Sequence, residues 1–265
     1  MKSYKKITVI SIIAVSILFA AGKFFLDSVY VPAILMYHSV CPARETPRGY
    51  RSKLNVLPAA FERQMKFLHD NNYKVIGLAD FVERIKKGEK IPHKTVAITF
   101  DDGLKNNFLY AYPVLKKYNF PAIMFVPSGA VGKEGYMNWD DIRAMRKNNI
   151  SIGSHTVTQS WLPSLNEKGI REELAGSKNA IERATGKPVK ILSYPVGAFD
   201  ERVKKIAKET GYTGAVATNP GKKYSAADSY ALKRIRISMT SNNMLVFWIE
   251  TSGYYTFIKE HRDED

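Results

Sequence analysis

The sequence predicts an α/β fold, a single barrel-like domain built around a largely parallel sheet. Short apolar segments alternate with helix-like segments along most of the chain, in about eight units. No linker-like segment, internal repeat or low-complexity tract divides them. The 265 residues, 45% of them hydrophobic, are enough to bury one sizeable core. One domain is therefore the economical interpretation.

The strand and helix assignments rest on length and periodicity. Strands are expected where short apolar runs stand between turn residues, and helices where apolar side chains recur at helical spacing, as Phe61, Met65 and Leu68 do. The expected strands are residues 33–37, 73–76, 95–100, 122–126, 150–154, 190–194, 214–217 and 235–238. The expected helices are one beginning at Pro58 and residues 78–87, 105–118, 139–147, 167–185 and 200–209.

The N-terminus has the composition of a targeting segment. Three lysines within the first six residues precede an uncharged apolar run over residues 7–22. The small residues at 20–22 could form a cleavage site, or the segment could remain as an uncleaved anchor helix, and both readings stay open. Basic residues before such a run keep the N-terminus inside and send the rest of the chain outward. Residues 1–32 are therefore expected to be a signal peptide or membrane anchor with a connector, and residues 33–265 an exported domain, anchored facing outward or secreted.

Composition excludes several other classes of protein. The net charge of +15 favours anionic surroundings such as membrane headgroups or acidic polymers. The basic residues are scattered and no nucleic-acid-binding motif occurs, so no nucleic-acid partner is expected. Cys41 is the single cysteine, which rules out an internal disulfide and a thiolate metal site. The sequence makes no prediction of oligomeric state.

An acidic pair follows one of the expected strands. Asp101 and Asp102 end the strand 95–100 and precede Gly103. The carboxyl ends of strands are where α/β folds place their chemistry. Two adjacent carboxylates at a turn can take different tasks, one binding a metal while the other accepts a proton. Taken alone, these residues could equally form an ordinary acidic turn.

Polar clusters at other strand ends favour a functional site. Residues 35–38 end with His38, residues 154–159 include His155, and residues 193–197 include Pro195. Each cluster alone is weak evidence. In a parallel barrel, however, all strand carboxyl ends share one rim, so these residues and the acidic pair are expected to converge.

These motifs resemble a known family. Thr-Phe-Asp-Asp-Gly at 99–103, Ser-His-Thr at 154–156 and Tyr-Pro-Val-Gly at 194–197 have the order and spacing of the polysaccharide deacetylases with a NodB-type domain, carbohydrate esterase family 4. Leu-Met-Tyr-His at 35–38 and Leu-Lys-Arg-Ile at 232–235 are similar to a permuted branch that de-N-acetylates poly-N-acetylglucosamine.

The resemblance covers about residues 33 to 250. It implies a single distorted (β/α) barrel of NodB type, preceded here by the signal or anchor helix. It also implies a metal-dependent hydrolase that removes N-acetyl groups from a cell-surface polysaccharide containing N-acetylglucosamine.

The resemblance also implies roles for individual residues. Asp101 would be the general base, and His38 the general acid that protonates the leaving amine. Asp102 and His155 would bind a divalent metal, zinc being the expected one. The backbone N–H of Val196 would help to bind the oxyanion. These roles suit amide hydrolysis, which needs a polarised carbonyl, a base for water and an acid for the amine.

The metal-binding motif departs from the family pattern at one position. Gln159 stands where the family has a second histidine, and a neutral amide oxygen is a weaker zinc ligand than imidazole. A weakly held metal on Asp102 and His155, completed by Gln159 or water, is expected; a harder cation or no metal are the alternatives. The alternative function is a degenerate deacetylase-fold protein that binds glycans without hydrolysing them.

One further departure and three aromatic residues concern the sugar-binding wall. Val196 stands where the family often has a large aromatic side chain, which implies a less enclosed wall. Ser193 stands where the family often has an arginine, but the branch resembled here commonly lacks that arginine. Tyr136, Trp139 and Trp161 fall in segments expected near the rim, where they could stack on sugar faces, although aromatic residues are more often part of the core.

Overall fold

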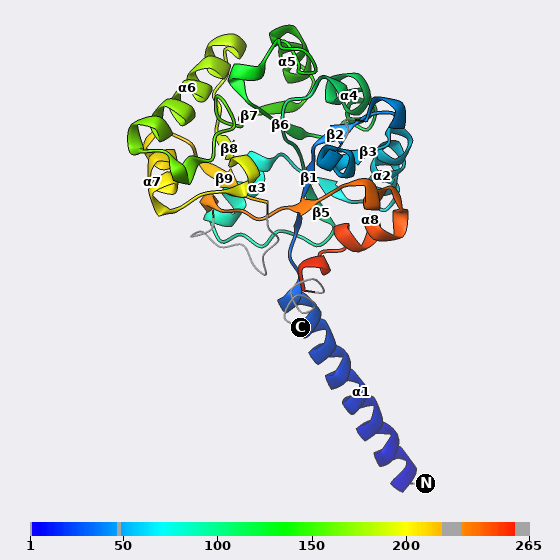
Figure 1. Cartoon of the computed structure of the whole chain (residues 1–265). Helices are drawn as coiled ribbons and strands as arrows, with labels where there is room; N and C mark the ends of the chain where they lie inside the picture. The colour runs from blue at the N-terminus through cyan, green and yellow to red at the C-terminus, as the bar shows by residue number, and fades with distance from the viewer. Residues whose placement is uncertain (1, 47–48, 219–228, 258–265) are drawn as a thin grey trace.

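The computed structural model describes residues 2–46, 49–218 and 229–257, and it confirms the α/β architecture. A curled, fully parallel sheet forms the centre, helices pack around it, and a long N-terminal helix projects from one end (Figure 1). The strands of this sheet are β1 Ala33–Tyr37, β4 Lys74–Val75, β5 Thr95–Phe100, β6 Ala122–Val126, β7 Ile150–Ser154, β8 Ile191–Ser193, β9 Gly214–Val216 and β10 Ile235–Arg236.

The helices follow the expected order, with two differences. The helices are α1 Lys2–Val29, α2 Pro58–Asp70, α3 Leu78–Lys86, α4 Tyr112–Lys117, α5 Trp139–Arg146, α6 Glu167–Thr185, α7 Glu201–Glu209 and α8 Met244–Thr251. The expected helix 105–118 begins as a π-helical turn, η3 Asn107–Ala111, before α4. The sequence also did not predict α8, or the two-residue strands β2 Ser39–Val40 and β3 Asn55–Val56, which pair with each other.

The sheet curls far enough to close almost into a barrel. Its strand order is β10-β1-β5-β6-β7-β8-β9, with β4 also paired to β5. The open edge is bridged by residues 232–236. Leu232 makes a parallel bridge to Val216 of β9, and three residues later β10 begins and pairs with Leu35 and Met36 of β1. One short segment therefore spans from the last strand of the sheet to the first.

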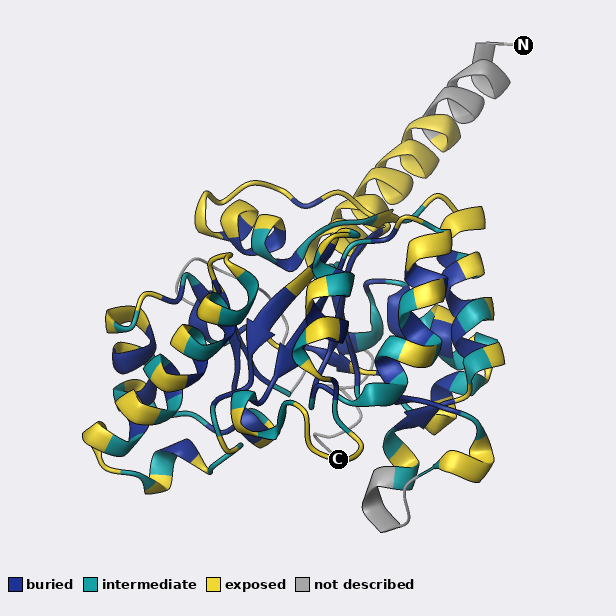
Figure 2. Cartoon of the chain, turned by 90° about the horizontal axis from the view of Figure 1, so that it is seen from above, coloured by how far each residue is buried: buried dark blue, intermediate teal, exposed yellow. Residues whose placement is uncertain are grey.

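The core divides along the two faces of the strands, because successive side chains point to opposite faces. Figure 2 shows the strands as the buried centre, with exposed residues on the outer faces of the helices. One set of strand residues, including Ile98 and Met124, packs with most of the helices in the larger cluster. The alternate residues, including Ala97 and Ile123, pack with the apolar face of α3 in the smaller cluster.

The register of the strands creates a common rim. Phe100, the last residue of β5, is paired with Tyr37 and Met124, and Val126 is paired with Ser154. The ladder continues one residue beyond β5, where the Asp101 N–H donates to the Tyr37 carbonyl. The polar segments that follow these strands therefore meet at one end of the sheet, as the parallel-barrel interpretation predicts.

The N-terminal helix is attached at the opposite end of the sheet. Val31 leads directly into the amino end of β1, and its N–H donates to the Gly253 carbonyl at 2.8 Å. The Tyr30 ring stacks on the His93 ring with centroids 3.9 Å apart, and His93 Nε2 lies 3.0 Å from an oxygen of Asp27. Aromatic and charged contacts therefore hold the end of α1 against the domain.

Within the described part of the chain, α1 alone is long and apolar enough to cross a membrane, over Ser11–Val29. That stretch has no side chain buried against the protein. A signal sequence has the same length and apolar character, so this helix fits both a membrane anchor and a signal peptide.

A buried polar chain links β1 to α8. Tyr37 donates to Gln64 at 2.9 Å, Gln64 donates to the Ser241 carbonyl at 2.7 Å, and the Ser241 hydroxyl donates to Glu250 Oε1 at 3.0 Å. Glu250 Oε2 is buried without a hydrogen-bond partner in the described structure. Burial raises the pKa of Glu250 from an ordinary 4.5 to about 7.

The Glu250 carboxyl should therefore make stability fall as pH rises. The folded state holds this proton more tightly than the unfolded chain. Below pH 4.5 the carboxyl is protonated in both states and its burial carries no charge penalty, whereas above pH 7 it is ionised in both states and destabilises the fold by about 3 kcal/mol. Glu250→Gln should remove this pH dependence and gain about 1–2 kcal/mol near pH 8, since its buried amide still lacks partners. Urea unfolding of both proteins near pH 5 and pH 8 measures the difference; equal pH dependence would show that Glu250 does not titrate in this range.

Candidate active site

One pocket of about 430 Å³ opens at the rim, and every residue expected at the site lines it. These residues come from the ends of β1, β5, β7 and β8, which the sheet places side by side. The described residues that line the pocket are His38, Leu54, Asp101, Asp102, His155, Gln159, Pro195, Val196, Thr218 and Arg236. The predicted convergence of the strand-end clusters is thus observed.

Asp101 is buried at the floor of this region and paired with Arg234. The guanidinium donates from Nη1 to Asp101 Oδ1 at 2.8 Å and from Nη2 to Oδ2 at 2.7 Å, a bidentate geometry. Neither side chain is appreciably exposed, with 0% of Arg234 and 3% of Asp101 accessible. A buried pair of this kind fixes the carboxylate in position and in its ionised form.

The remaining donors of Arg234 are also satisfied. Nε donates to the Ala217 carbonyl at 2.9 Å, Nη1 to Thr99 at 3.1 Å and Nη2 to the Ser193 hydroxyl at 3.0 Å. With the two bonds to Asp101, these use all five N–H groups of the guanidinium. The arginine therefore has one defined position between β5, β8 and β9.

Burial and charge act in opposite directions on Asp101. Burial alone would raise the pKa of this carboxyl, but attraction to Arg234, His155 and His38 outweighs it, so the pKa lies below its ordinary value. The carboxylate is thus ionised at neutral pH. Each oxygen keeps lone-pair capacity beyond its bond to Arg234 and could accept a proton.

Asp102, His155 and Gln159 form a second cluster beside Asp101. His155 Nδ1 lies 2.9 Å from the Ser193 carbonyl, so this nitrogen carries the proton and donates it there. The other ring nitrogen, Nε2, lies 3.6 Å from Asp102 Oδ1. Gln159 Nε2 donates to the same Asp102 oxygen at 2.7 Å. Burial would raise the pKa of Asp102, but its contacts with His155, His38 and Gln159 lower it well below the ordinary value.

This cluster fits a divalent metal as a site with few protein ligands. The hydrogen bond from Nδ1 to Ser193 makes Nε2 the ring atom that faces Asp102, which is the orientation a metal ligand needs. Burial would lower the pKa of His155, but the contact with Asp102 and the attraction to Asp101 raise it, so a metal would have to displace a proton from Nε2. A 3.6 Å gap between nitrogen and oxygen can be spanned by one ion with bonds of about 2.0–2.2 Å. No group of three His, Cys, Asp or Glu side chains suited to a metal occurs among the described residues. Any third protein ligand here would be the amide oxygen of Gln159.

His38 lines the same pocket as Asp101 and Asp102. Its Nδ1 is buried and has no hydrogen-bond partner in the described structure. Burial lowers the pKa of His38, although attraction to Asp101 and Asp102 partly opposes the shift. The lowered pKa makes the imidazolium a stronger acid and also reduces its population at neutral pH.

Three residues that line the pocket have a left-handed backbone conformation, which is rare for residues other than glycine. Val196 is 71% exposed and has φ 49°, a left-handed conformation that is costly for a β-branched residue. Asp102 and Gln159 also have positive φ, 71° and 60°. Strain of this kind persists where the surrounding structure imposes it, and functional sites are a common location.

Arg234 is the site residue whose role the sequence did not identify. It appeared there as part of a motif at 232–235, without a contact assigned to it. Lys233 and Arg236 lie beside it in the sequence, so no local pattern singles out Arg234 as the buried charge. Ser193, where the family often has an arginine, hydrogen bonds to Arg234 and lies 3.3 Å from Asp101 Oδ2. In this chain the guanidinium beside Asp101 therefore comes from the segment that leads into β10, and not from position 193 at the end of β8.

The three aromatic residues that were expected near the rim differ in their surroundings. Trp139 begins α5 and packs against the core, so it is not an open stacking surface. Trp161 is 56% exposed, and Tyr136 lines a cavity beside the pocket at the rim.

Comparison with known proteins agrees with the geometry. The family model for polysaccharide deacetylases matches residues 88–215. The chain is 36% identical over 205 residues to YxkH of Bacillus subtilis (strain 168), a protein named provisionally as a polysaccharide deacetylase, covering 77% of this chain and 71% of the relative. It is 29% identical over 198 residues to a poly-β-1,6-N-acetyl-D-glucosamine N-deacetylase of Staphylococcus aureus (strain N315), covering 69% of this chain and 68% of that protein.

Solved structures give the same result. The structure of the Streptococcus pyogenes deacetylase PplD in complex with acetate superposes with a TM-score of 0.73 and 28% sequence identity. The match covers 83% of this chain and 98% of that one. With a NodB-type parallel barrel, an acidic pair at its rim and these relatives, the chain belongs to the polysaccharide deacetylase family.

Proposed function

We propose that the protein is a metal-dependent hydrolase that removes N-acetyl groups from a cell-surface polysaccharide containing N-acetylglucosamine. The observation that carries this proposal is the convergence of Asp101, Asp102, His155 and His38 in one pocket. The relative from Staphylococcus aureus, which is named for this reaction on poly-β-1,6-N-acetyl-D-glucosamine, supports the choice of substrate class. We assign residues 33–265 to the catalytic domain and residues 1–32 to the anchor and connector.

Asp101 is the general base in this proposal. It is ionised and aligned by the Arg234 fork, so it accepts the proton of the attacking water without first having to move. Arg234 is a positioning residue, since it contacts the base and not the reacting atoms. Its charge also makes Asp101 a weaker base, which is the chemical cost of keeping a buried carboxylate ionised.

His38 and Val196 act on the later part of the reaction. The Val196 N–H donates to the oxyanion, and a preorganised donor of this kind contributes roughly 3 kcal/mol. His38 gives its proton to the departing amine, because an amine cannot leave efficiently as its anion. The lowered pKa of His38 makes its imidazolium a stronger acid toward the amine, while a smaller fraction of the protein carries that proton at neutral pH.

Asp102 and His155 would hold the metal, and we propose zinc. Such an ion acts as a Lewis acid toward the amide carbonyl and acidifies water. Gln159 contributes at most a neutral amide oxygen, so affinity should be low and mild chelation should remove the ion. In its present orientation the Gln159 amide nitrogen donates to Asp102, and binding through its oxygen requires the amide to turn over.

That hydrogen bond between Gln159 and Asp102 is also the observation that favours a second candidate function. It satisfies Asp102 within the protein and leaves two strong metal ligands. The second candidate is a glycan-binding protein that retains the fold and has lost hydrolysis.

Acetate release distinguishes the two candidates. The purified protein, reconstituted with zinc, is incubated with N-acetylglucosamine oligomers, and acetate and bound zinc are measured together. Zinc-dependent release that chelation abolishes is the expected result. Oligomer binding without acetate release, at full zinc occupancy, would reject the hydrolase and favour the glycan-binding protein.

Gln159→His should strengthen metal binding. An imidazole four residues after His155 supplies a third strong ligand, and zinc affinity should rise at least tenfold. Acetate release at limiting zinc should rise with it, provided that Asp101 and His38 are correctly placed. Competition with a chromogenic chelator measures the affinity, and Gln159→Asn is the matched control because it keeps an amide. Unchanged zinc affinity in the histidine variant would mean that residue 159 does not face the metal.

We propose that α1 remains as a membrane anchor and that the enzyme faces outward. Asp27 and Tyr30 contact the domain at His93, beyond the small residues at 20–22 where a signal peptide would be cut. Because α1 joins the amino end of β1, the catalytic rim lies at the far end of the sheet from the helix. An anchored protein would thus present its pocket away from the lipid surface.

A reporter fused after Asp265 tests the export proposal. Alkaline phosphatase, which folds actively outside the cytoplasm, should be active in the fusion because the lysines before α1 hold the N-terminus inside. The same fusion lacking residues 1–32 should be inactive. Activity of the shortened fusion alone, or of neither, would contradict export through this segment.

A further inference from the structure

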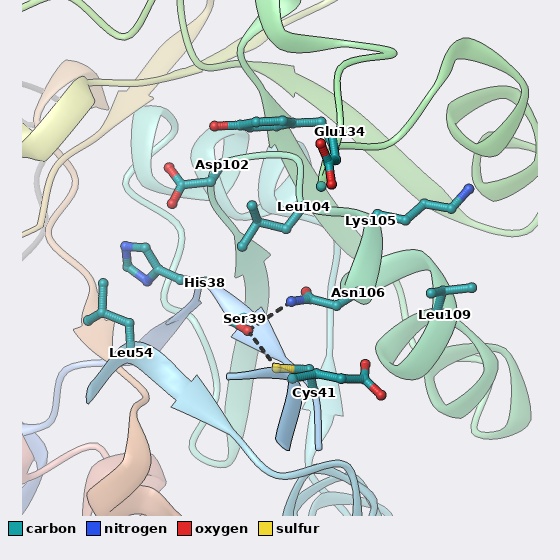
Figure 3. A pocket seen from close by; sticks show the side chains of 13 residues that line it. His38, Ser39, Cys41, Leu54, Asp102, Leu104, Lys105, Asn106, Leu109 and Glu134 are labelled. Carbon is teal, nitrogen blue, oxygen red and sulfur yellow. Dashed lines mark hydrogen bonds between the residues drawn. The ribbon is translucent and has the colours of Figure 1, made fainter. Parts of the chain in front are cut away.

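A second cavity of about 360 Å³ adjoins the catalytic pocket. The two share His38, Leu54 and Asp102, so a chain bound in one can continue into the other. Figure 3 shows these three residues at one side of the cavity, with Leu104 in the middle and Lys105 extending away from Asp102. The described lining is completed by Ser39, Cys41, Glu45, Asn106, Leu109, Glu134, Gly135 and Tyr136.

Backbone hydrogen bonds join residues 134–136 of this cavity to the loop that carries Asp102. Tyr136 forms an antiparallel bridge with Leu104, only two residues after Asp102. The Lys105 N–H donates to the Gly135 carbonyl at 2.9 Å. Glu134 and Tyr136 are therefore held in a defined position relative to Asp102 by backbone hydrogen bonds.

The lining suits one sugar unit of a polymer. Leu104, Leu109 and the half-buried Tyr136 ring offer apolar surface for the face of a pyranose ring, as carbohydrate sites commonly do with aromatic side chains. The volume lies within the range of small-ligand pockets, about 300–1,000 Å³. The sugar placed here would be the neighbour of the one whose acetyl group is being removed.

The charges indicate which neighbour is preferred. Lys105 is neutralised by Asp141, which accepts from its ammonium with both oxygens at 2.8 and 2.7 Å. Glu45 accepts from Tyr110 and lies 3.6 Å from Arg44, so its charge is partly offset. Glu134, by contrast, is exposed and makes no ion pair within the described ranges. A protein of net charge +15 thus presents an unneutralised carboxylate at this cavity.

We infer that this cavity binds the adjoining sugar of the polymer and, through Glu134, prefers one whose amine is already free. The inference rests on the proposed function, because removal of an acetyl group turns a neutral amide into an ammonium ion. An ammonium in the cavity gains attraction to Glu134, whereas an N-acetyl group gains none. Each deacetylation would favour the next on the neighbouring unit, so the product would carry free amines in blocks.

Glu134→Gln tests this preference with two oligomers of equal length. One is fully N-acetylated, and the other carries a single glucosamine beside the reacting unit. The natural protein should show about two- to fivefold higher kcat/KM on the amine-bearing oligomer, the range of a solvent-exposed ion pair. The variant should lose this preference, so that its kcat/KM becomes equal on the two oligomers. Glu167→Gln, an exposed change in the first turn of α6, is the matched control and should behave as the natural protein.

Direct titration with a glucosamine oligomer separates this inference from the proposed function. Binding should weaken by the same factor in Glu134→Gln, and high salt should abolish the difference. This arm gives a result even if no oligomer releases acetate, which would reject the hydrolase alone. Equal affinity in the variant and the natural protein would overturn the inference, as would an equal loss of kcat/KM on both oligomers.

Discussion

Arg234→Met should destabilise the domain by about 3–5 kcal/mol and abolish acetate release. The substitution leaves the Asp101 carboxylate buried without its partner, and a single unpaired buried charge costs this much. Without the guanidinium, burial also raises the pKa of Asp101, so the carboxyl becomes protonated and cannot accept a proton from water. Urea unfolding and acetate release measure the two effects on the same protein.

A second substitution separates stability from catalysis. In Arg234→Met/Asp101→Leu both charges are gone, and replacing both members of a buried pair by apolar groups is often neutral. We expect the double variant to recover most of the lost stability while remaining inactive. Arg234→Lys keeps a charge but not the fork, so it should fall between the natural protein and the methionine variant in both measurements. A fully active methionine variant would remove Arg234 from the positioning of the base.

The sequence predicted the features of the fold that depend on the residues of one strand and the polar cluster directly after it. A short apolar run followed by a polar cluster marks the end of a parallel strand, and the register of β1, β5 and β7 then brings His38, Asp101 and His155 to one rim. Only the strand pattern was needed to predict that convergence, because parallel strands in one sheet must end on the same side.

Contacts between distant segments were not predictable in this way. Arg234 meets Asp101 from 133 positions along the chain, and this depends on how far the sheet curls. Nothing in the local pattern at 232–236 states which carboxylate the guanidinium reaches. The same limit applies to the buried chain from Tyr37 to Glu250, whose members come from four separate elements. Two-residue strands such as β2 and β3 carry too few residues to show any period.

Asp101→Asn should reduce acetate release by about 10²–10⁴-fold while bound zinc stays near the level of the natural protein. The amide keeps the shape of the side chain but cannot accept the proton of water, and it is not expected to be a metal ligand. Asp102→Asn is the matched variant on the adjacent residue, and it should lose zinc as well as acetate release. Zinc content and turnover are measured on both, after circular dichroism has confirmed that each is folded.

The comparison is informative because the two aspartates are neighbours with different surroundings. Asp101 faces a guanidinium and is fully buried, whereas Asp102 faces an imidazole and an amide and is 18% exposed. Asp101 is closed off from solvent and its charge is already balanced by Arg234, whereas Asp102 is partly open, so the ion is expected on Asp102 and the proton on Asp101. If Asp101→Asn lost zinc and Asp102→Asn retained it, the two roles would be exchanged. If both variants kept zinc and full turnover, neither carboxylate would take part in the reaction.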